Sequence, residues 1–181
     1  TIVYKDSQQR KNLEAAIAAI DFDYTWVQGG KERQDSVFNA LLSQPDDCEY
    51  IFIHDCARPL ISTKAIQDLY TSVKMHSASV LARPVSDTIK RVTSTKLDTP
   101  NELEDLDRSR LWAMETPQAF SYTKICEAYE QVIADKVSVT DDCAAASYVN
   151  IKCCIVTSDE PNPKITTASD LDYITWLVEQ R

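Results

Sequence analysis

The segment His54-Asp55-Cys56-Ala57-Arg58-Pro59 carries a dense group of reactive side chains and follows the short apolar run 50–53. An apolar run of this kind is typical of a strand that is buried on both faces. An aspartate at the end of such a strand is held rigidly, so Asp55 could accept hydrogen bonds from hydroxyl groups or bind a hard cation such as Mg²⁺. Arg58 could hold a phosphate through two parallel hydrogen bonds. A structural alternative stays open, in which Asp55 caps a turn and Arg58 pairs with it at the surface.

A second segment, Gly29-Gly30-Lys31-Glu32-Arg33-Gln34-Asp35-Ser36-Val37, holds the only two glycines of the chain. Adjacent glycines let a backbone approach a flat ligand closely, so backbone N–H and C=O groups here could contact the edge of a base. The alternative is a strand-to-helix turn with Asp35 or Ser36 near the helix cap. A GxGxxG loop needs three glycines, and a GxxxxGK loop needs two that lie five positions apart. These 181 residues have only two, which are adjacent, so they contain neither phosphate loop.

Four further polar clusters follow predicted buried segments. They are residues 87–90, Arg108 with Thr116, residues 140–142 and residues 162–166. The third cluster opens a predicted helix, whose free N–H groups favour anions. Taken singly, each cluster could be a cap, a turn or a solvated charge. If they meet at one edge of a sheet, their cations and hydroxyl groups suit a phosphate, and their carboxylates suit the hydroxyl groups of a polyol.

The elements that must position these clusters alternate between strands and helices. Strands are predicted at 1–4, 22–27, 50–53, 79–82 and 151–156. One helix is predicted to begin at residue 7, another follows residue 30, and three more lie at 63–76, 122–134 and 141–148. A last helix is predicted with Thr167 or Ser169 as its cap. This alternation predicts an α/β domain with a mainly parallel sheet, helices on both faces and functional loops at the carboxyl ends of the strands. The strands predicted at 87–92 and 110–120 flank an acidic stretch, 93–107, which predicts a projecting arm. We treat residues 1–181 as a single domain.

Composition excludes several classes of protein. There are 19 Lys and Arg against 28 Asp and Glu, so the formal charge of −9 argues against nucleic-acid and anionic-lipid partners. No apolar run approaches the roughly 20 residues that span a membrane. The six cysteines and two histidines show no zinc-binding spacing, so we expect reduced thiols and a cytoplasmic protein.

Six motifs, in order and spacing, resemble the 2-C-methyl-D-erythritol 4-phosphate cytidylyltransferases, enzymes of the non-mevalonate isoprenoid pathway. The motifs are VQGGKERQDSV, HDCARP, ARPVSDTIKRV, DRSRLWAMETPQAF, VTDDCAAA and NPKITTASDL, and together they cover essentially the whole chain. The resemblance implies a Rossmann-like α/β nucleotidyltransferase fold with a projecting β-arm at about 87–120, and a homodimer built by those arms. It also implies that the phosphate of methylerythritol phosphate attacks the α-phosphorus of CTP in line. The products are a CDP-alcohol and pyrophosphate, with Mg²⁺ or another divalent cation as cofactor.

The resemblance further implies roles for single residues. Gly30 and Ser36 resemble the contacts to cytosine and ribose, and Gly29 and Arg33 resemble residues that support this loop. Cys56 stands where the family usually has Ala, so its backbone would contact the nucleotide.

The same resemblance implies a polyol phosphate site. Its residues would be Asp55, Arg58, Thr88, Arg108, Thr116, Thr140 and Lys164. Asp55 resembles the carboxylate that lies near the ribose, the substrate hydroxyls and the metal. It is therefore a candidate ligand of the metal. Arg108 and Lys164 match the two cations that hold the attacking phosphate, and Arg108 would come from the partner's arm.

Besides Cys56, the sequence departs from the family pattern in three places. The family begins with a strand and a glycine-rich AAGxGxR loop followed by a Lys, and nothing in these 181 residues matches them. We therefore expect these residues alone to give no measurable turnover of CTP, and an upstream glycine-rich segment to restore it. Glu115 replaces the usual Gln or Leu, and Pro163 replaces the Ile of Asn-Ile-Lys, which removes a backbone donor but leaves Lys164 in place.

Two other functions stay open. One is a ribitol 5-phosphate cytidylyltransferase, although the DTIK and Asp-Arg-x-x-Leu-Trp segments resemble the methylerythritol enzyme more closely. The other is a non-catalytic, dimeric binding module that keeps the alcohol-phosphate pocket without the triphosphate loop.

Overall fold

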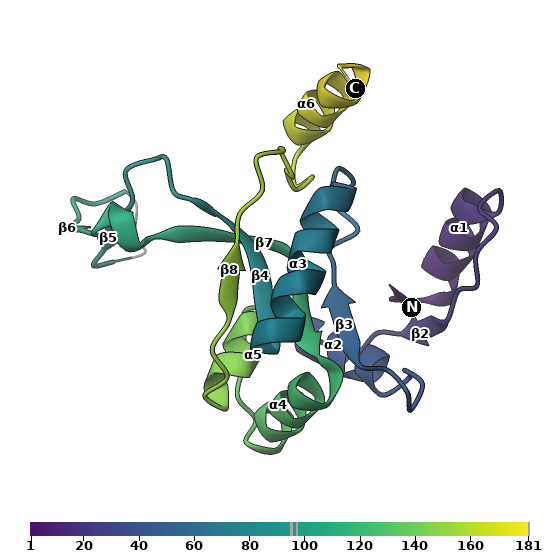
Figure 1. Cartoon of the computed structure of the whole chain (residues 1–181). Coiled ribbons are helices and arrows are strands. Elements are labelled where there is room, and N and C mark those ends of the chain that lie inside the picture. Colours follow the sequence, from purple (N-terminus) through teal and green to yellow (C-terminus); the bar gives the residue numbers. More distant parts are fainter. Residues whose placement is uncertain (95, 97, 181) are drawn as a thin grey trace.

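The central sheet of the molecule has four strands in the order β3-β7-β4-β8. The computed structural model describes residues 1–94, 96 and 98–180. The strands are β3 (Tyr50–Ile53), β4 (Ala78–Pro84), β7 (Trp112–Ser121) and β8 (Cys154–Val156). β3, β4 and β8 point in one direction, and β7 runs against them (Figure 1). The predicted α/β architecture is confirmed, with β7 reversed because the chain returns through it from the arm.

Helices cover both faces of this sheet, as predicted. The helices are α3 (Thr63–His76), α4 (Tyr122–Ala134) and α5 (Asp142–Tyr148). Neighbouring residues of a strand point to opposite faces. Ala119 of β7 therefore packs with Leu69 and Val73 of α3, whereas Phe120 packs with Ile125 and other residues of α4. The two faces of β7 thus carry two hydrophobic clusters, which fix the sheet between its helices.

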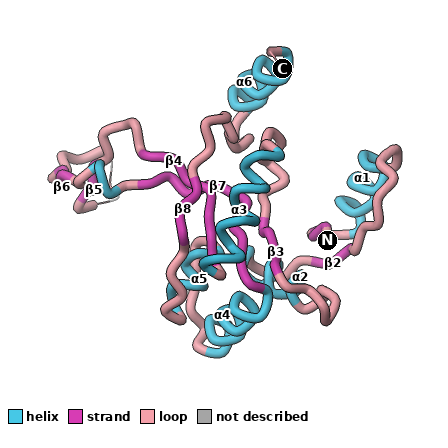
Figure 2. The backbone as a smooth tube through the Cα atoms, viewed as in Figure 1, coloured by secondary structure: helices cyan, strands magenta, loops and turns pink. Residues whose placement is uncertain are grey.

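The N-terminal residues form a separate two-stranded sheet (Figure 2). β1 (Ile2–Tyr4) pairs in parallel with β2 (Trp26–Gln28), and α1 (Ser7–Ile17) connects them. The strand predicted at 22–27 was too long at its start, because β1 offers partners only to Trp26, Val27 and Gln28. α2 (Arg33–Leu41) follows β2 and packs against α4, which joins this part of the chain to the central layers.

The predicted arm leaves the central sheet after β4 and returns through β7 (Figure 1). β5 (Lys90–Val92) pairs antiparallel with β6 (Leu103–Asp105), and a 3-10 turn, η1 (Arg108–Arg110), precedes β7. All residues of β5 and β6 are exposed. Within the expected range 87–120, residues 115–120 of β7 are buried in the central sheet, so the exposed arm lies before them.

The last helix, α6 (Ala168–Glu179), has Thr167 as its N-cap, which is one of the two predicted candidates, Thr167 and Ser169. Asp170 completes a capping box with Thr167. Only Ile174 of this helix is buried, whereas the side chains of Leu171 and Trp176 are more than half exposed. In the residues that the structure describes, no helix is both long and apolar enough to cross a membrane.

Candidate active site

Asp55 lies between two cations at the carboxyl end of β3. Its Oδ2 is 2.8 Å from Nζ of Lys164 and 3.9 Å from Nε of Arg58. Burial by itself would raise the pKa of Asp55. The hydrogen bond and charge of Lys164, together with the charges of Arg33 and Arg58, outweigh burial and hold the pKa below its ordinary value. Asp55 is therefore ionised at neutral pH, when it can accept hydrogen bonds from hydroxyl groups or bind a cation.

The loop from Asp55 to Arg58 is a closed turn, tied to the segment that carries Lys164. Arg58 N donates to the carbonyl of Asp55 at 2.9 Å, and Ile165 N donates to the carbonyl of Ala57 at 2.8 Å. The Arg58 side chain is only 13% exposed, and its Nη1 donates to the carbonyl of Asn162 at 2.7 Å. The alternative of a surface pair is therefore met only in part: Arg58 does pair with Asp55, but its side chain is largely buried and the turn is closed by a backbone carbonyl.

Thr116 of β7 joins the same loop from the other side. Its Oγ1 accepts a hydrogen bond of 3.0 Å from Asp55 N, and it lies 3.0 Å from Nδ1 of His54. The other ring nitrogen of His54 is 3.0 Å from the carbonyl of Arg58. Part of His54 is exposed to solvent, but desolvation of its ring is still the main cause of its lowered pKa, so the imidazole is neutral at neutral pH. Contact between Thr116 and a substrate stays a prediction, since this hydroxyl already holds the loop.

The predicted base-binding loop leads into α2. Ser36 Oγ accepts a hydrogen bond of 3.0 Å from Gly30 N. Glu32 is the N-cap of α2 and forms a capping box with Asp35, so Asp35 lies near the helix cap, as the alternative of a strand-to-helix turn expected. A Cβ on Gly30 would lie 2.2 Å from Cβ of Asp35, and one on Gly29 would lie 2.7 Å from Oγ of Ser36. Gly30 is thus required by the close approach of the loop to the first turn of its own helix, whereas the nearest contact at Gly29 is a side-chain hydroxyl.

Arg33 connects this loop to the start of α5. Its Nη1 and Nη2 donate to Oδ1 and Oδ2 of Asp142 at 3.0 and 2.7 Å. The hydroxyl of Tyr129 donates to the same Oδ1 at 2.6 Å. Burial, reinforced by the charge of Asp142, raises the pKa of Tyr129. Sequence reasoning missed this ion pair, because Asp142 lies 109 residues from Arg33. The only local signal for Asp142 was its place in a pair of aspartates at the start of a predicted helix.

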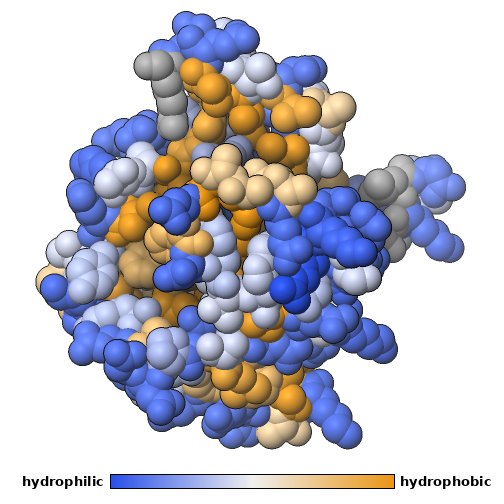
Figure 3. Space-filling model, turned by 90° about the vertical axis from the view of Figure 1, so that its right-hand side faces the viewer, coloured by the Kyte–Doolittle hydropathy of each residue, from blue (hydrophilic) through white to orange (hydrophobic). Residues whose placement is uncertain are grey.

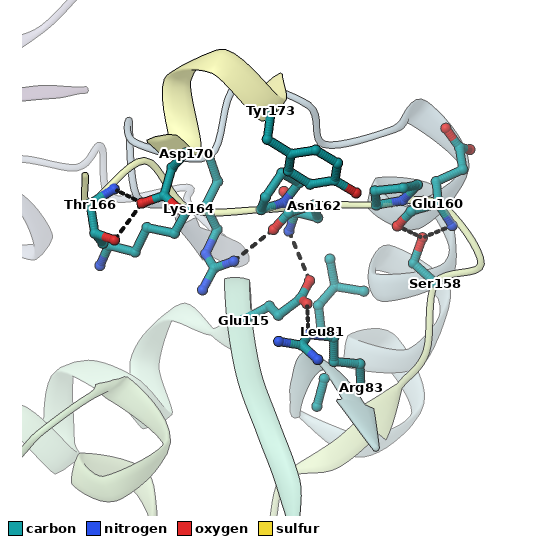
Figure 4. Close-up of a pocket in the computed structure, with 14 residues that line it drawn as sticks. Leu81, Arg83, Glu115, Ser158, Glu160, Asn162, Lys164, Thr166, Asp170 and Tyr173 are labelled. Atoms are coloured by element: carbon teal, nitrogen blue, oxygen red, sulfur yellow. Dashed lines mark hydrogen bonds and ion pairs between the residues drawn. The ribbon is translucent and has the colours of Figure 1, made fainter. Parts of the chain in front are cut away.

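Two cavities are each bordered by one member of the Asp55–Lys164 ion pair. One, of about 390 Å³, is bordered by Arg33, Ser36, His54 and Asp55, and its wall is largely apolar. Figure 3 shows hydrophobic side chains around a hollow on the side of the molecule that carries the N-terminal elements. The other cavity, of about 580 Å³, is bordered by Lys164 and Arg58 (Figure 4). The ion pair therefore stands between space beside the predicted base loop and space beside the predicted phosphate cations.

Glu115 and Asn162 form the buried wall of the larger cavity (Figure 4). Asn162 Nδ2 donates to Oε2 of Glu115 at 3.1 Å and to the carbonyl of Thr116 at 2.9 Å. Arg83 Nε lies 3.3 Å from Oε1 of the same glutamate. The unusual Glu115 is thus compensated by Arg83 and Asn162, and its burial carries no unpaired charge.

The remaining predicted site residues lie on the arm, just before α5, or at the tip of the turn 55–58. Thr88 and Arg108 are exposed on the arm, where Arg108 Nη1 donates to the carbonyl of Ser86 at 2.9 Å. Among the described residues, no hydrogen bond or ion pair joins either residue to Asp55 or Lys164. Thr140 is exposed just before the N-cap of α5, and Cys56 is exposed at the tip of its turn.

A model of the family described as 2-C-methyl-D-erythritol 4-phosphate cytidylyltransferase matches residues 2–180 of this chain. The chain belongs to this family. The predicted membership of the 2-C-methyl-D-erythritol 4-phosphate cytidylyltransferases is thereby confirmed, and with it the class of nucleotidyltransferase. The family match assigns no role to single residues, so the roles given above stay predictions.

Curated relatives agree with this assignment to the 2-C-methyl-D-erythritol 4-phosphate cytidylyltransferases. The protein of that name from Dictyoglomus thermophilum is 42% identical over 158 residues, which are 87% of this chain and 67% of that protein. The one from Synechococcus elongatus is 36% identical over 176 residues, or 95% of this chain and 73% of that protein.

Solved structures agree as well. The 2-C-methyl-D-erythritol 4-phosphate cytidylyltransferase of Francisella tularensis is 30% identical with a TM-score of 0.76, and the match covers 87% of this chain and 75% of that chain. The 4-diphosphocytidyl-2C-methyl-D-erythritol synthase of Anaerococcus prevotii has a TM-score of 0.84 at 24% identity, covering 99% of this chain and 77% of that chain. The second likeness supports the fold alone.

Proposed function

We propose that the full-length protein transfers a cytidylyl group from CTP to 2-C-methyl-D-erythritol 4-phosphate, giving the CDP-alcohol and pyrophosphate. The observation that carries the proposal is the ion pair of 2.8 Å between Asp55 and Lys164, in a chain of this family. It stands between the cavity that reaches Ser36 and the cavity that reaches Arg58. Two ligands bound in the two cavities would thus meet at a carboxylate and an ammonium group.

In this reaction a phosphate oxygen of the alcohol forms a bond to the α-phosphorus of CTP, and the bond to the departing pyrophosphate breaks. The loop from Gly29 to Ser36 would bind the base and ribose, and Asp55 would accept hydrogen bonds from sugar or polyol hydroxyls. Lys164 would hold the attacking phosphate oxygens. The residues contribute position and charge rather than a covalent intermediate.

We propose that Asp55 also supplies one oxygen ligand to Mg²⁺ or another divalent cation. Mg²⁺ in proteins is commonly bound by one or two carboxylates together with substrate phosphates, so a single protein carboxylate fits this ion. The described residues contain no group of three or more His, Cys, Asp or Glu that could bind a metal by themselves. When bound, the cation would neutralise negative charge on phosphate oxygens. Loss of turnover on chelation, and recovery on adding Mg²⁺, would support this assignment.

A homodimer joined by the arms would complete the site. The apolar side chains of Ile89, Val92 and Leu103 are 42%, 40% and 61% exposed on the arm, and a second copy would cover them. The partner's arm would bring Thr88 and Arg108 to the polyol phosphate. Sedimentation that shows only monomer at tens of micromolar would contradict this arrangement.

A mixing experiment tests whether Arg108 acts in the partner's site. Arg108→Ala and Lys164→Ala subunits, each inactive alone, would recover about a quarter of the wild-type activity after random pairing, because half of the dimers contain one intact site. If the subunits have exchanged and the mixture still shows no recovered activity, Arg108 acts in the site of its own subunit.

Activity measurements separate this function from its alternatives. Pyrophosphate release by the full-length protein should require CTP and methylerythritol phosphate together. A preference for ribitol 5-phosphate would instead identify a ribitol 5-phosphate cytidylyltransferase. Binding of the alcohol phosphate without any pyrophosphate release would indicate a binding module.

We place the protein in the cytoplasm, because its six cysteine thiols are free and disulfides are rare there. Cell fractionation in the native host tests this location. Recovery of the protein outside the cytoplasmic fraction would contradict it.

A further inference from the structure

His54 is bonded at both ring nitrogens, and its two contacts lie on opposite sides of the turn that carries Asp55 and Arg58. Nδ1 lies 3.0 Å from Oγ1 of Thr116, and Nε2 lies 3.0 Å from the carbonyl of Arg58. The imidazole therefore closes a ring over the turn from residue 54 to residue 58. In the HDCARP motif, the sequence gives roles to Asp55, Cys56 and Arg58, and the function proposed above gives none to His54.

The hydrogen-bond pattern identifies the neutral tautomer of this imidazole. Thr116 Oγ1 already accepts a hydrogen bond from Asp55 N, so the hydroxyl hydrogen of Thr116 is available to donate to His54 Nδ1. Nε2 faces a carbonyl oxygen, which can only accept, so Nε2 must carry the hydrogen. The opposite neutral tautomer would set a bare Nε2 against the carbonyl oxygen of Arg58 and lose that bond.

The same contacts determine where Asp55 and Arg58 point. The turn between them contains no helix or strand, and it is closed by Arg58 N donating to the carbonyl of Asp55 at 2.9 Å. Through Thr116, His54 orders the amide of Asp55, and directly it orders the carbonyl of Arg58. Small displacements of groups that hold a substrate reduce rate strongly, because reaction requires reacting atoms to be closely aligned.

We propose that His54 is a positioning residue, held as the Nε2–H tautomer, that presents Asp55 and Arg58 to the substrates. It does not contact the reacting atoms itself, and it acts through Thr116 and through the backbone of the turn. Its effect on turnover rests on the function proposed above, whereas its tautomer and its two hydrogen bonds do not.

The kinetic experiment compares three variants of the full-length protein. His54→Ala removes both hydrogen bonds and should lower kcat/KM for the alcohol phosphate by about 10- to 30-fold, mainly through kcat. The amide nitrogen of a glutamine side chain lies as many bonds from the backbone as His54 Nε2, so His54→Gln keeps a donor for the Arg58 carbonyl. This variant should stay within about fivefold of the wild type. His76→Ala is the matched control, because His76 is exposed at the end of α3 and should leave the kinetics unchanged.

A residue with a merely structural role would give a different result. His54→Ala would then lower the free energy of unfolding, while kcat per folded molecule stayed within threefold of the wild type. That outcome would overturn the proposal, as would a His54→Gln variant no better than His54→Ala.

Nitrogen NMR of histidine-labelled protein decides the tautomer without any assay of activity. The imidazole signal that disappears in His54→Ala should show a protonated Nε2 and a bare Nδ1 at neutral pH. A protonated Nδ1, or rapid exchange between tautomers, would refute the inferred hydrogen bonds. If the wild type releases no pyrophosphate, the proposed function fails, and the NMR result still decides whether His54 closes the turn in this way.

Discussion

The guanidinium group of Arg33 lies against the carboxylate of Asp142, with two hydrogen bonds of 3.0 and 2.7 Å. Their environments differ, because the side chain of Arg33 is 40% exposed whereas that of Asp142 is fully buried. The pair ties the start of α2, and with it the loop from Gly29 to Ser36, to the start of α5. Its two members should therefore respond unequally to substitution.

Arg33→Ala should destabilise the protein more than Asp142→Asn. Removing Arg33 leaves a buried carboxylate with Tyr129 as its remaining side-chain donor, which should cost about 3–5 kcal/mol. Removing the charge of Asp142 leaves a half-exposed guanidinium that water can solvate, so the cost should be about 1–3 kcal/mol. Urea unfolding measures both free energies. Equal costs, or the reverse order, would contradict this account of the pair.

Gly30→Ala should weaken CTP binding and lower stability by about 1–3 kcal/mol, more than Gly29→Ala does. A Cβ at position 30 meets Cβ of Asp35 at 2.2 Å and the backbone of the same residue at 3.2 Å, and neither can rotate away. A Cβ at position 29 meets the hydroxyl of Ser36, which can rotate. Calorimetric titration with CTP and chemical denaturation of the two variants compare these effects. A Gly30→Ala variant that is as stable as wild type would show that α2 can shift to make room.

Lys164→Ala and Arg108→Ala in the full-length enzyme should depress turnover much more than they change CTP binding. Each would remove a charge-assisted contact to the attacking phosphate, at a cost of about 2–4 kcal/mol in the transition state, or roughly 30- to 1,000-fold in rate. The structure also supports placing Lys164 in the site, since its Nζ lies 2.8 Å from Oδ2 of Asp55. Steady-state kinetics within threefold of wild type for either variant would remove that residue from the site.

The start of α6 should loosen as the pH falls from about 4 to 2. Hydrogen bonds from the hydroxyl and backbone N–H of Thr166, and from Thr167, lower the pKa of Asp170 from 3.8 to about 2. Because the pKa in the folded state is lower than in the unfolded state, the carboxylate stabilises the helix start above about pH 4, and this contribution is lost on protonation.

Carbon NMR titration of the Asp170 carboxyl group measures this pKa directly. Thr166→Val is the informative control, because the side-chain hydrogen bond from Thr166 is the largest cause of the shift. The pKa of Asp170 should rise in that variant. An Asp170 that titrates near 3.8 in the wild type would contradict the hydrogen bonding at this cap.

Several elements could be predicted to the residue from local pattern. The apolar run 50–53 is β3, and the spacing of apolar residues correctly bounded α3 and α4. Local pattern also narrowed the cap of α6 to Thr167 or Ser169, and Thr167 is the cap, because a cap depends on side chains within three or four positions of it. Where a strand depended on a distant partner, the prediction was less accurate: β2 is shorter than expected because β1 is short.

The sequence by itself determined the α/β class, the family and the set of candidate residues, because these depend on local periodicity and on ordered motifs. Only the tertiary structure decided which of those residues meet. Thr116 reaches the amide of Asp55 across 61 positions, and Arg33 reaches Asp142 across 109. Such pairings depend on the order and direction of strands, above all on the reversed β7, and no spacing along the chain records them. Since charge and hydrogen bonding act over a few ångströms, the low pKa of Asp55 and the closed turn at His54 also exist only once the sheet has brought these segments together.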